Sequence, residues 1–201
     1  MINAQQCQEV FTRCIADYHR LDTVEQPMHN PYAAGSIDNL LYHKCWIDTV
    51  QWHYEDLIRD PQIDPVEGMR LKRLIDASNQ KRTDMVEQID DWFMQQFAGV
   101  TPLPDATINT ESPAWVVDRL SILALKIWHM QEQAERPDAD EQHRQKASAR
   151  LDVLLEQQAD LSMSFDQLLA DLQTGRKKMK VYRQMKLYND PATNPVLYKR
   201  K

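Results

Sequence analysis

The sequence from Lys72 to Phe93, KRLIDASNQKRTDMVEQIDDWF, decides the fold. Its apolar residues recur with the spacing of an α-helix, and at about 100° per residue they form a single stripe. Arg82 lies about 20° from the centre of that stripe, measured from Leu71. An unpaired buried charge costs several kcal/mol, so Arg82 needs partners. The sequence therefore predicts a buried polar site inside a helical protein.

The composition of the whole chain predicts the same fold class. The 201 residues include only 4 glycines and are rich in Leu, Gln, Asp, Glu, Ala and Met, which favours helices. No segment has the pattern of a β-strand. We expect an all-α protein with a single helical domain over residues 1–188, a bundle of about six helices, and an irregular basic C-terminal tail over residues 189–201.

Capping signals indicate where the helices begin and end. Asp64-Pro65-Val66-Glu67 combines an N-cap, a proline at the first helical position and a glutamate at the third, and it opens one long helix near residues 65–97. The capping pattern recurs at Ser164-Phe165-Asp166-Gln167, which predicts that the helical stretch over residues 141–172 is kinked or split near Ser162. Asn189-Asp190-Pro191 is expected to end the last helix.

Positive charge is concentrated at the C-terminus. The net charge of the chain is −6, but the segment from Thr174 to Lys201 holds nine Lys or Arg residues and one acid, so it carries +8 and the rest carries −14. Such a segment folds back on the acidic body or contacts a partner. We favour the first interpretation, because apolar anchors lie within the segment: Val181, Tyr182, Met185, Leu187 and Tyr188. The acidic body argues against a general nucleic-acid binder.

The apolar runs, the N-terminus and the cysteines indicate the cellular compartment of the protein. No apolar run approaches the length of a transmembrane segment, and the polar N-terminus shows no secretory signal. Cys7, Cys14 and Cys45 lack the spacing of a zinc site and are expected to be reduced core residues. We therefore expect a cytoplasmic protein without a transmembrane segment.

Polar residues gather on one arc of an otherwise apolar helix over residues 115–130. Asp118, Arg119, Lys126 and His129 share an arc of about 100°. The arc either faces water or lines a cleft opposite Arg82.

Two neighbouring helices carry further ionisable groups. On the helix before residue 60, His53 lies near Glu55 and Asp56, although a lone histidine there is more typical of a satisfied core residue. On the long helix, one flank of the apolar stripe is polar and is either solvated or functional. It consists of Lys72, Asp76, Asn79, Thr83, Glu87 and Asp90.

Four blocks of the chain resemble one known family: WHYEDLIRD (52–60), KRLIDASNQKRTDMVEQID (72–90), ESPAWVVDRLSILALKIWHM (111–130) and GRKKMKVYRQMKLYNDPATNPVLY (175–198). They are similar to an uncharacterised bacterial family of domains of unknown function, number forty-two fifty-four. The resemblance implies an all-helical soluble protein with no established activity, often encoded near glycosyltransferases and surface-polysaccharide assembly genes. Thr83 stands where the family has Asn. The family's recurring polar positions correspond here to Trp52, His53, Glu55, Asp56, Arg59, Lys72, Arg73, Asp76, Asn79, Gln80, Arg82, Asp84, Glu87, Asp90, Asp118, Arg119, Lys126, Arg183, Asn189 and Asp190.

Three functions stay open, and the sequence does not decide whether the protein is an enzyme. The first is an accessory or interaction protein with a buried network of Arg, Lys and acids, linked by the resemblance to a protein partner in polysaccharide assembly. The second is a site for a phosphate, nucleotide, nucleotide sugar or phosphorylated lipid carrier, with His53, Glu55 or Asp56 as acid or base. No glycine-rich loop is present, so helical side chains would bind the anion. The expected ligand-binding residues are Arg82, Arg119, Lys126, Lys72, Asn79, His129 and Arg183.

The third function is a magnesium-dependent nucleotide pyrophosphohydrolase built from helices. Such enzymes hold Mg²⁺ between carboxylates on two helices, and Glu87 with Asp90 fits one half of that pattern weakly. The other half would come from Glu55 or Asp56. Apart from this alternative, no metal or cofactor is predicted.

Overall fold

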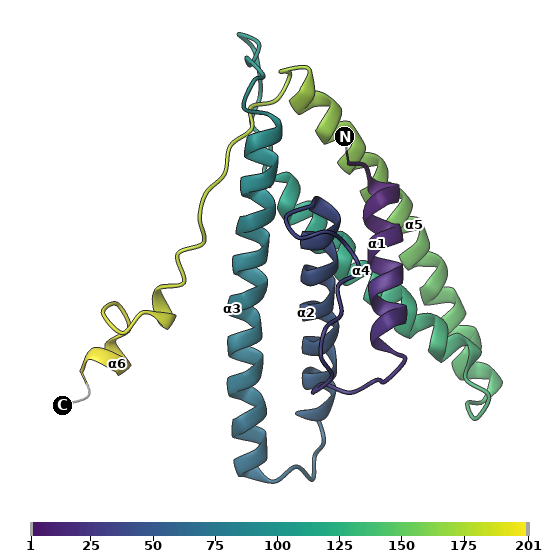
Figure 1. Ribbon diagram of the computed structural model, residues 1–201. Coiled ribbons are helices and arrows are strands. Elements are labelled where there is room, and N and C mark those ends of the chain that lie inside the picture. Colours follow the sequence, from purple (N-terminus) through teal and green to yellow (C-terminus); the bar gives the residue numbers. More distant parts are fainter. Residues whose placement is uncertain (1, 200–201) are drawn as a thin grey trace.

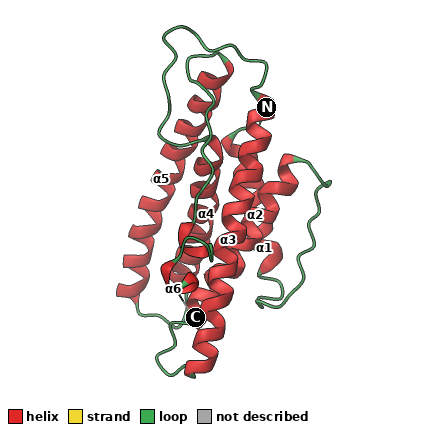
Figure 2. Cartoon of the chain, turned by 90° about the vertical axis from the view of Figure 1, so that its left-hand side faces the viewer, coloured by secondary structure: helices red, strands yellow, loops and turns green. Residues whose placement is uncertain are grey.

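The computed structural model describes residues 2–199, and in that range the chain is all-α, as predicted (Figures 1 and 2). The described part has no β-strand, only an isolated bridge between Thr107 and Lys177. Arg200 and Lys201 of the predicted basic tail lie outside the described residues. The helices are α1 (Ala4–Tyr18), α2 (Ile37–Leu57), α3 (Pro65–Gln96), α4 (Pro113–Glu135), α5 (Glu141–Gln173), a 3₁₀ turn η1 (Leu187–Asn189) and α6 (Pro195–Tyr198).

Helix α4 is at the centre of the molecule, since it packs against α1, α2, α3 and α5. Helices α2 and α3 run side by side, and α1 and α5 lie on the other side of α2 (Figure 1). The core between these helices contains large side chains that are almost fully buried, such as Tyr18, Phe93, Leu120 and Phe165. A central position explains why α4 is apolar almost all the way round.

The long helix begins where its sequence predicts. The Asp64 side chain accepts hydrogen bonds from the backbone N–H groups of Val66 and Glu67, and Pro65 occupies the first turn. The prediction of a kink or split near Ser162 is wrong, because α5 is one continuous helix from Glu141 to Gln173. Ser162 Oγ donates to the Gln158 carbonyl 2.5 Å away, one turn earlier, so the serine is accommodated inside the helix.

Gly175 ends α5 with a φ of +72°, a conformation that favours glycine. Its carbonyl accepts from the N–H of Leu103 at 2.9 Å, and an added Cβ would lie 2.7 Å from the Thr101 carbonyl oxygen. The chain therefore leaves α5 here. The expected last helix, closing at Asn189, does not form: within residues 176–199, only η1 and the single-turn α6 are helical.

The basic C-terminal segment does fold back along the outer side of α3 (Figure 1). Arg183 Nη2 lies 2.5 Å from Asp91 Oδ1, and the N–H of Gln184 donates to Glu87 Oε1 at 3.0 Å. Lys186 Nζ donates to the Asn79 carbonyl at 2.8 Å. These contacts are polar. The expected apolar anchors Tyr182, Met185, Leu187 and Tyr188 are instead exposed.

Two further expectations concern the core and the membrane. Cys7, Cys14 and Cys45 are free and buried, as predicted, and burial raises the pKa of Cys7 to about 12.

No helix in the described part of the chain has both the length and the apolar character that crossing a membrane requires.

Candidate functional site

Five side chains from three helices form one buried polar network. Arg82 of α3 donates from Nε to Asp48 Oδ1 of α2 at 2.7 Å, and from Nη2 to Asp118 Oδ1 of α4 at 3.1 Å. Lys44 of α2 pairs with Asp48 and lies 2.8 Å from Asp118 Oδ1. Ser121 Oγ donates to Asp48 Oδ2 at 2.6 Å. The predicted partners of Arg82 are therefore two aspartates, one on each neighbouring helix.

The network is fully buried at Lys44 and Asp48, partly buried at Arg82 and Asp118, and electrically balanced. Lys44 has no exposed surface and Asp48 is 2 % exposed. Two cations face two carboxylates, so no net charge is left in the interior, and each carboxylate accepts from more than one donor. Burial alone would raise the pKa of Asp118, but Lys44 and Arg82 outweigh burial and hold its pKa below the ordinary value. The charged form of Asp118 is thus stabilised by its neighbours.

The helical period explains how the sequence brings these groups together. Lys44 and Asp48 are four residues apart on α2, and Asp118 and Ser121 are three apart on α4, so each pair shares a helix face. Next to the network, Gln51 Nε2 of α2 donates to Asn79 Oδ1 of α3 at 2.9 Å. These side-chain contacts hold α2 and α3 in one antiparallel register.

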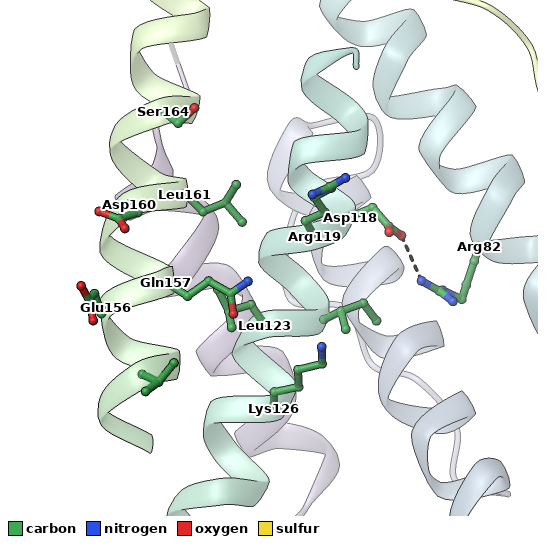
Figure 3. Close-up of a pocket in the computed structure, with 12 residues that line it drawn as sticks. Arg82, Asp118, Arg119, Leu123, Lys126, Glu156, Gln157, Asp160, Leu161 and Ser164 are labelled. Carbon is green, nitrogen blue, oxygen red and sulfur yellow. Dashed lines mark hydrogen bonds and ion pairs between the residues drawn. The ribbon is translucent and has the colours of Figure 1, made fainter. Parts of the chain in front are cut away.

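A cleft of about 840 Å³ opens beside the network, between α4 and α5 (Figure 3). Arg119 and Lys126 of α4 lie on one side of it, with Arg82 and Asp118 at its inner edge. The α5 side contributes Leu161 and polar residues that include Gln157 and two acids, and Leu161 and Gln157 point toward α4. The two acids are Glu156 and Asp160.

The two α4 cations in this cleft differ in their pairing. Arg119 is mostly exposed and lies 2.8 Å from Glu111 Oε1. Lys126 has no carboxylate within 4.0 Å among residues 2–199. The polar arc of α4 is therefore divided: Asp118 belongs to the buried network, Arg119 and Lys126 face the cleft, and His129 lies elsewhere.

A second hollow of about 360 Å³ adjoins the first at Arg82 and Ile122. Trp52, Glu55 and Asp56 line it. Glu55 is paired with Arg59, whose Nη1 lies 2.6 Å away, as their spacing on the helix predicts. Glu55 and Asp56 are thus near Arg82, whereas His53 points to a different group of side chains.

The remaining predicted residues do not reach either hollow. Lys72 pairs with Asp76 on the exposed surface of α3, and Arg183 binds Asp91 and Glu87 from the C-terminal segment. Asn79 is engaged with Gln51 and Lys186. These three side chains therefore bind other groups of the protein and do not line either hollow.

The structure does not bring Glu87 and Asp90 to Glu55 and Asp56. The bond between Gln51 and Asn79 fixes the antiparallel register of α2 and α3. Glu55 lies four residues beyond Gln51, while Glu87 lies eight residues beyond Asn79 in the opposite direction, a separation of roughly 18 Å along the helices. Among residues 2–199, no group of three or more carboxylates with metal-binding spacing includes any of these acids.

His53 and His129 approach each other and His19, at the end of α1. Burial is the main cause that lowers the pKa of His53. His19, Lys44, Asp48 and Ser121 were not among the residues predicted from the sequence. The spacing of Lys44 and Asp48 on a helix apolar on two sides was a usable signal for a buried pair, whereas His19 had none.

Fold and site together define an all-α protein whose central helices are joined through a charge-balanced buried network. Residues 38–181 match the family described as "Protein of unknown function (DUF4254)", and the chain belongs to this family. No curated protein and no solved structure matches the chain.

Proposed function

We propose that this protein is a non-catalytic interaction protein in which a rigid helical body presents a C-terminal arm, residues 176–199, to a protein partner. One observation carries the proposal: apart from Met179, which packs against the core, the arm is attached by polar contacts, while seven of its large apolar side chains are exposed. They are Tyr182, Met185, Leu187, Tyr188, Val196, Leu197 and Tyr198. Soluble proteins rarely expose apolar groups in such density unless the surface binds something.

The chemistry of the arm defines the partner surface. Lys177, Lys178, Lys180 and Lys199 have no carboxylate within 4.0 Å in the range 2–199, so their charges are free to attract an acidic surface. Tyrosines next to basic residues are typical of protein interfaces. We therefore propose an acidic protein surface with apolar pockets. The family resemblance suggests a component of surface-polysaccharide assembly as that partner.

The buried network supports the same function. Its charges are balanced and hydrogen-bonded to each other, so Arg82 and Lys44 serve to hold three helices rather than to bind a ligand. A network of this kind can specify helix register without any chemistry.

Photo-crosslinking from the arm tests the proposal. A crosslinking residue at Tyr188 is expected to label one acidic protein in cells, and the same residue at Val153, exposed on α5, is the control. The labelled protein is then purified and its affinity for the full chain measured. Leu187→Ser with Tyr188→Ser should weaken binding at least about tenfold, given that interface anchors contribute more than about 1.4 kcal/mol. The proposal would be refuted by equal labelling from Val153 or by labelling of lipid instead of protein. It would also be refuted if the variant with Leu187→Ser and Tyr188→Ser bound the partner as tightly as the wild-type chain.

A second candidate is binding of an anionic ligand in the cleft between α4 and α5. The observation that favours it is that Lys126, which lines the cleft with Arg119, has no carboxylate within 4.0 Å in the described chain. Acids and amides on the α5 side suit a ligand with hydroxyl groups, such as a nucleotide sugar. Calorimetric titration with a uridine diphosphate sugar tests this candidate. Lys126→Ala should abolish binding and Lys146→Ala, elsewhere on α5, should not.

A further inference from the structure

Three histidine rings from three separate helical segments converge at one end of the bundle. His19 caps the C-terminus of α1, His53 lies near the end of α2, and His129 lies in the second half of α4. One ring nitrogen of each lies within 4.8 Å of the other two. All three side chains are largely buried. The group lies outside both the ion network and the cleft between α4 and α5.

The free nitrogen atoms of these rings point inward. Nε2 of each ring is buried and has no hydrogen-bond partner. In His19, Nδ1–H donates to the Ile15 carbonyl at 2.7 Å, and in His129 it donates to Glu132 Oε2 at 2.8 Å. Since the acceptors take the proton at Nδ1, the lone pair of a neutral ring is left on Nε2. Buried lone pairs that face each other without a donor are unfavourable, and a cation between them would satisfy all three.

The orientation of each ring is fixed by an aromatic neighbour. His53 stacks on Tyr18 with 5.0 Å between ring centroids, and His129 stacks on Trp52 with 4.8 Å. His19 stacks on Trp128 with 5.1 Å. His19 and His129 are each held on a ring face and at Nδ1, as metal-binding histidines are, where an outer acceptor sets the tautomer and the ring direction.

Asp22 places a carboxylate beside two of the three rings. Its Oδ1 lies 3.6 Å from His53 Nε2 and 4.0 Å from His19 Nε2. Asp22 is also the one non-glycine residue with positive φ in the described chain, at +50°. Such a backbone conformation carries strain and is common at ligand sites.

We propose that His19, His53 and His129 bind a divalent transition-metal ion of the zinc class through Nε2, with Asp22 as the fourth ligand. Imidazole and carboxylate ligands in a four-coordinate arrangement suit Zn²⁺. A tetrahedral zinc ion with bonds of about 2.0–2.1 Å places its ligands about 3.3 Å apart, so the rings approach by at most about 1.5 Å. With four protein ligands the site is closed, and the ion joins the ends of α1, α2 and α4.

Metal titration of the full chain tests the site. After dialysis against a chelator, calorimetry with ZnCl₂ is expected to give one ion per chain, and CoCl₂ the intense visible absorption of tetrahedral cobalt. His53→Gln and His129→Gln should each weaken binding more than about 100-fold, beyond the 10–100-fold that losing an outer partner such as Glu132 costs. His29→Gln, at an exposed histidine outside the group, should leave the affinity unchanged.

His19→Cys gives a readout that does not depend on loss of binding. If residue 19 is a ligand, the cobalt form gains a thiolate-to-metal charge-transfer band in the near ultraviolet, which the wild-type chain with its three buried cysteines lacks. Circular dichroism verifies the helicity of each variant. Any one of three results would overturn the proposal. The first is an unchanged zinc affinity in His53→Gln and His129→Gln, the second is the absence of the charge-transfer band in folded His19→Cys, and the third is a wild-type chain that binds no zinc.

Discussion

Arg82 Nε lies 2.7 Å from Asp48 Oδ1, and the same guanidinium also reaches Asp118. A single side chain of α3 therefore connects the carboxylates of α2 and α4. Lys44 approaches both carboxylates from the other side, so the four charges alternate in sign around the network. Removing one member leaves an excess of the opposite charge in a buried position.

Arg82→Leu is expected to destabilise the protein by about 3–5 kcal/mol, because it leaves two buried carboxylates with one cation. Urea unfolding measures the change. Arg119→Leu is the matched control: it removes an arginine from an exposed pair with Glu111, and exposed pairs contribute about 0–1 kcal/mol. In a double-mutant cycle, Asp118→Leu should cost less in the Arg82→Leu background than alone. A loss below 1 kcal/mol for Arg82→Leu would contradict the structural role of the network.

Acid should weaken the fold through Asp118. Its pKa is held below the ordinary aspartate value in the folded protein, so the stabilisation is fully present above the unfolded pKa of about 3.9. The stabilisation is lost as the pH falls through the lower folded pKa, where Asp118 becomes protonated. Free energies of unfolding from pH 7 down to pH 2 should decline over that window. Asp118→Asn should flatten this part of the profile, and an unaltered acid dependence in this variant would contradict the assignment.

The cysteines should be unreactive in the folded chain. Burial raises the pKa of Cys7 to about 12, and the attacking species is the thiolate, so almost none is present at pH 8. Cys14 and Cys45 are buried as well. A colorimetric thiol reagent should label all three thiols rapidly in urea and only slowly without it. Rapid labelling of Cys7 under native conditions would show that this part of the core opens readily.

Deleting residues 189–201 should change the stability little. Within the described range this segment is exposed, and its side-chain contact with the body is the bond from Asn189 to Gln80. The melting temperature should shift by less than about 2 °C. Phe165→Ala, which removes a fully buried ring, is the positive control and should cost about 3–5 kcal/mol in the same experiment. A drop comparable to that control would mean that the segment is part of the folded body.

The all-α fold class and most helix positions could be predicted from the local sequence. Capping residues and the amphipathic pattern of a helix depend on residues only a few positions apart. The failures have local causes too. The start signal Ser164-Phe165-Asp166-Gln167 lies inside α5, which stays continuous, and the segment after Gly175 has helical composition but leaves the helix at a left-handed residue. A propensity for helix does not decide the outcome where a glycine turn and loop pairing compete with it.

The sequence by itself determined that Arg82 must find partners, that α4 carries one polar arc, and that the C-terminus is a basic segment. It did not determine which residues meet. Asp48 and Asp118 are 34 and 36 positions from Arg82, and His19, His53 and His129 come from three different helical segments. The helical period shows which side chains share a face, but the rotation and register of one helix against another depend on packing across the whole core. That packing alone decided that two aspartates surround Arg82 and that three histidines face each other.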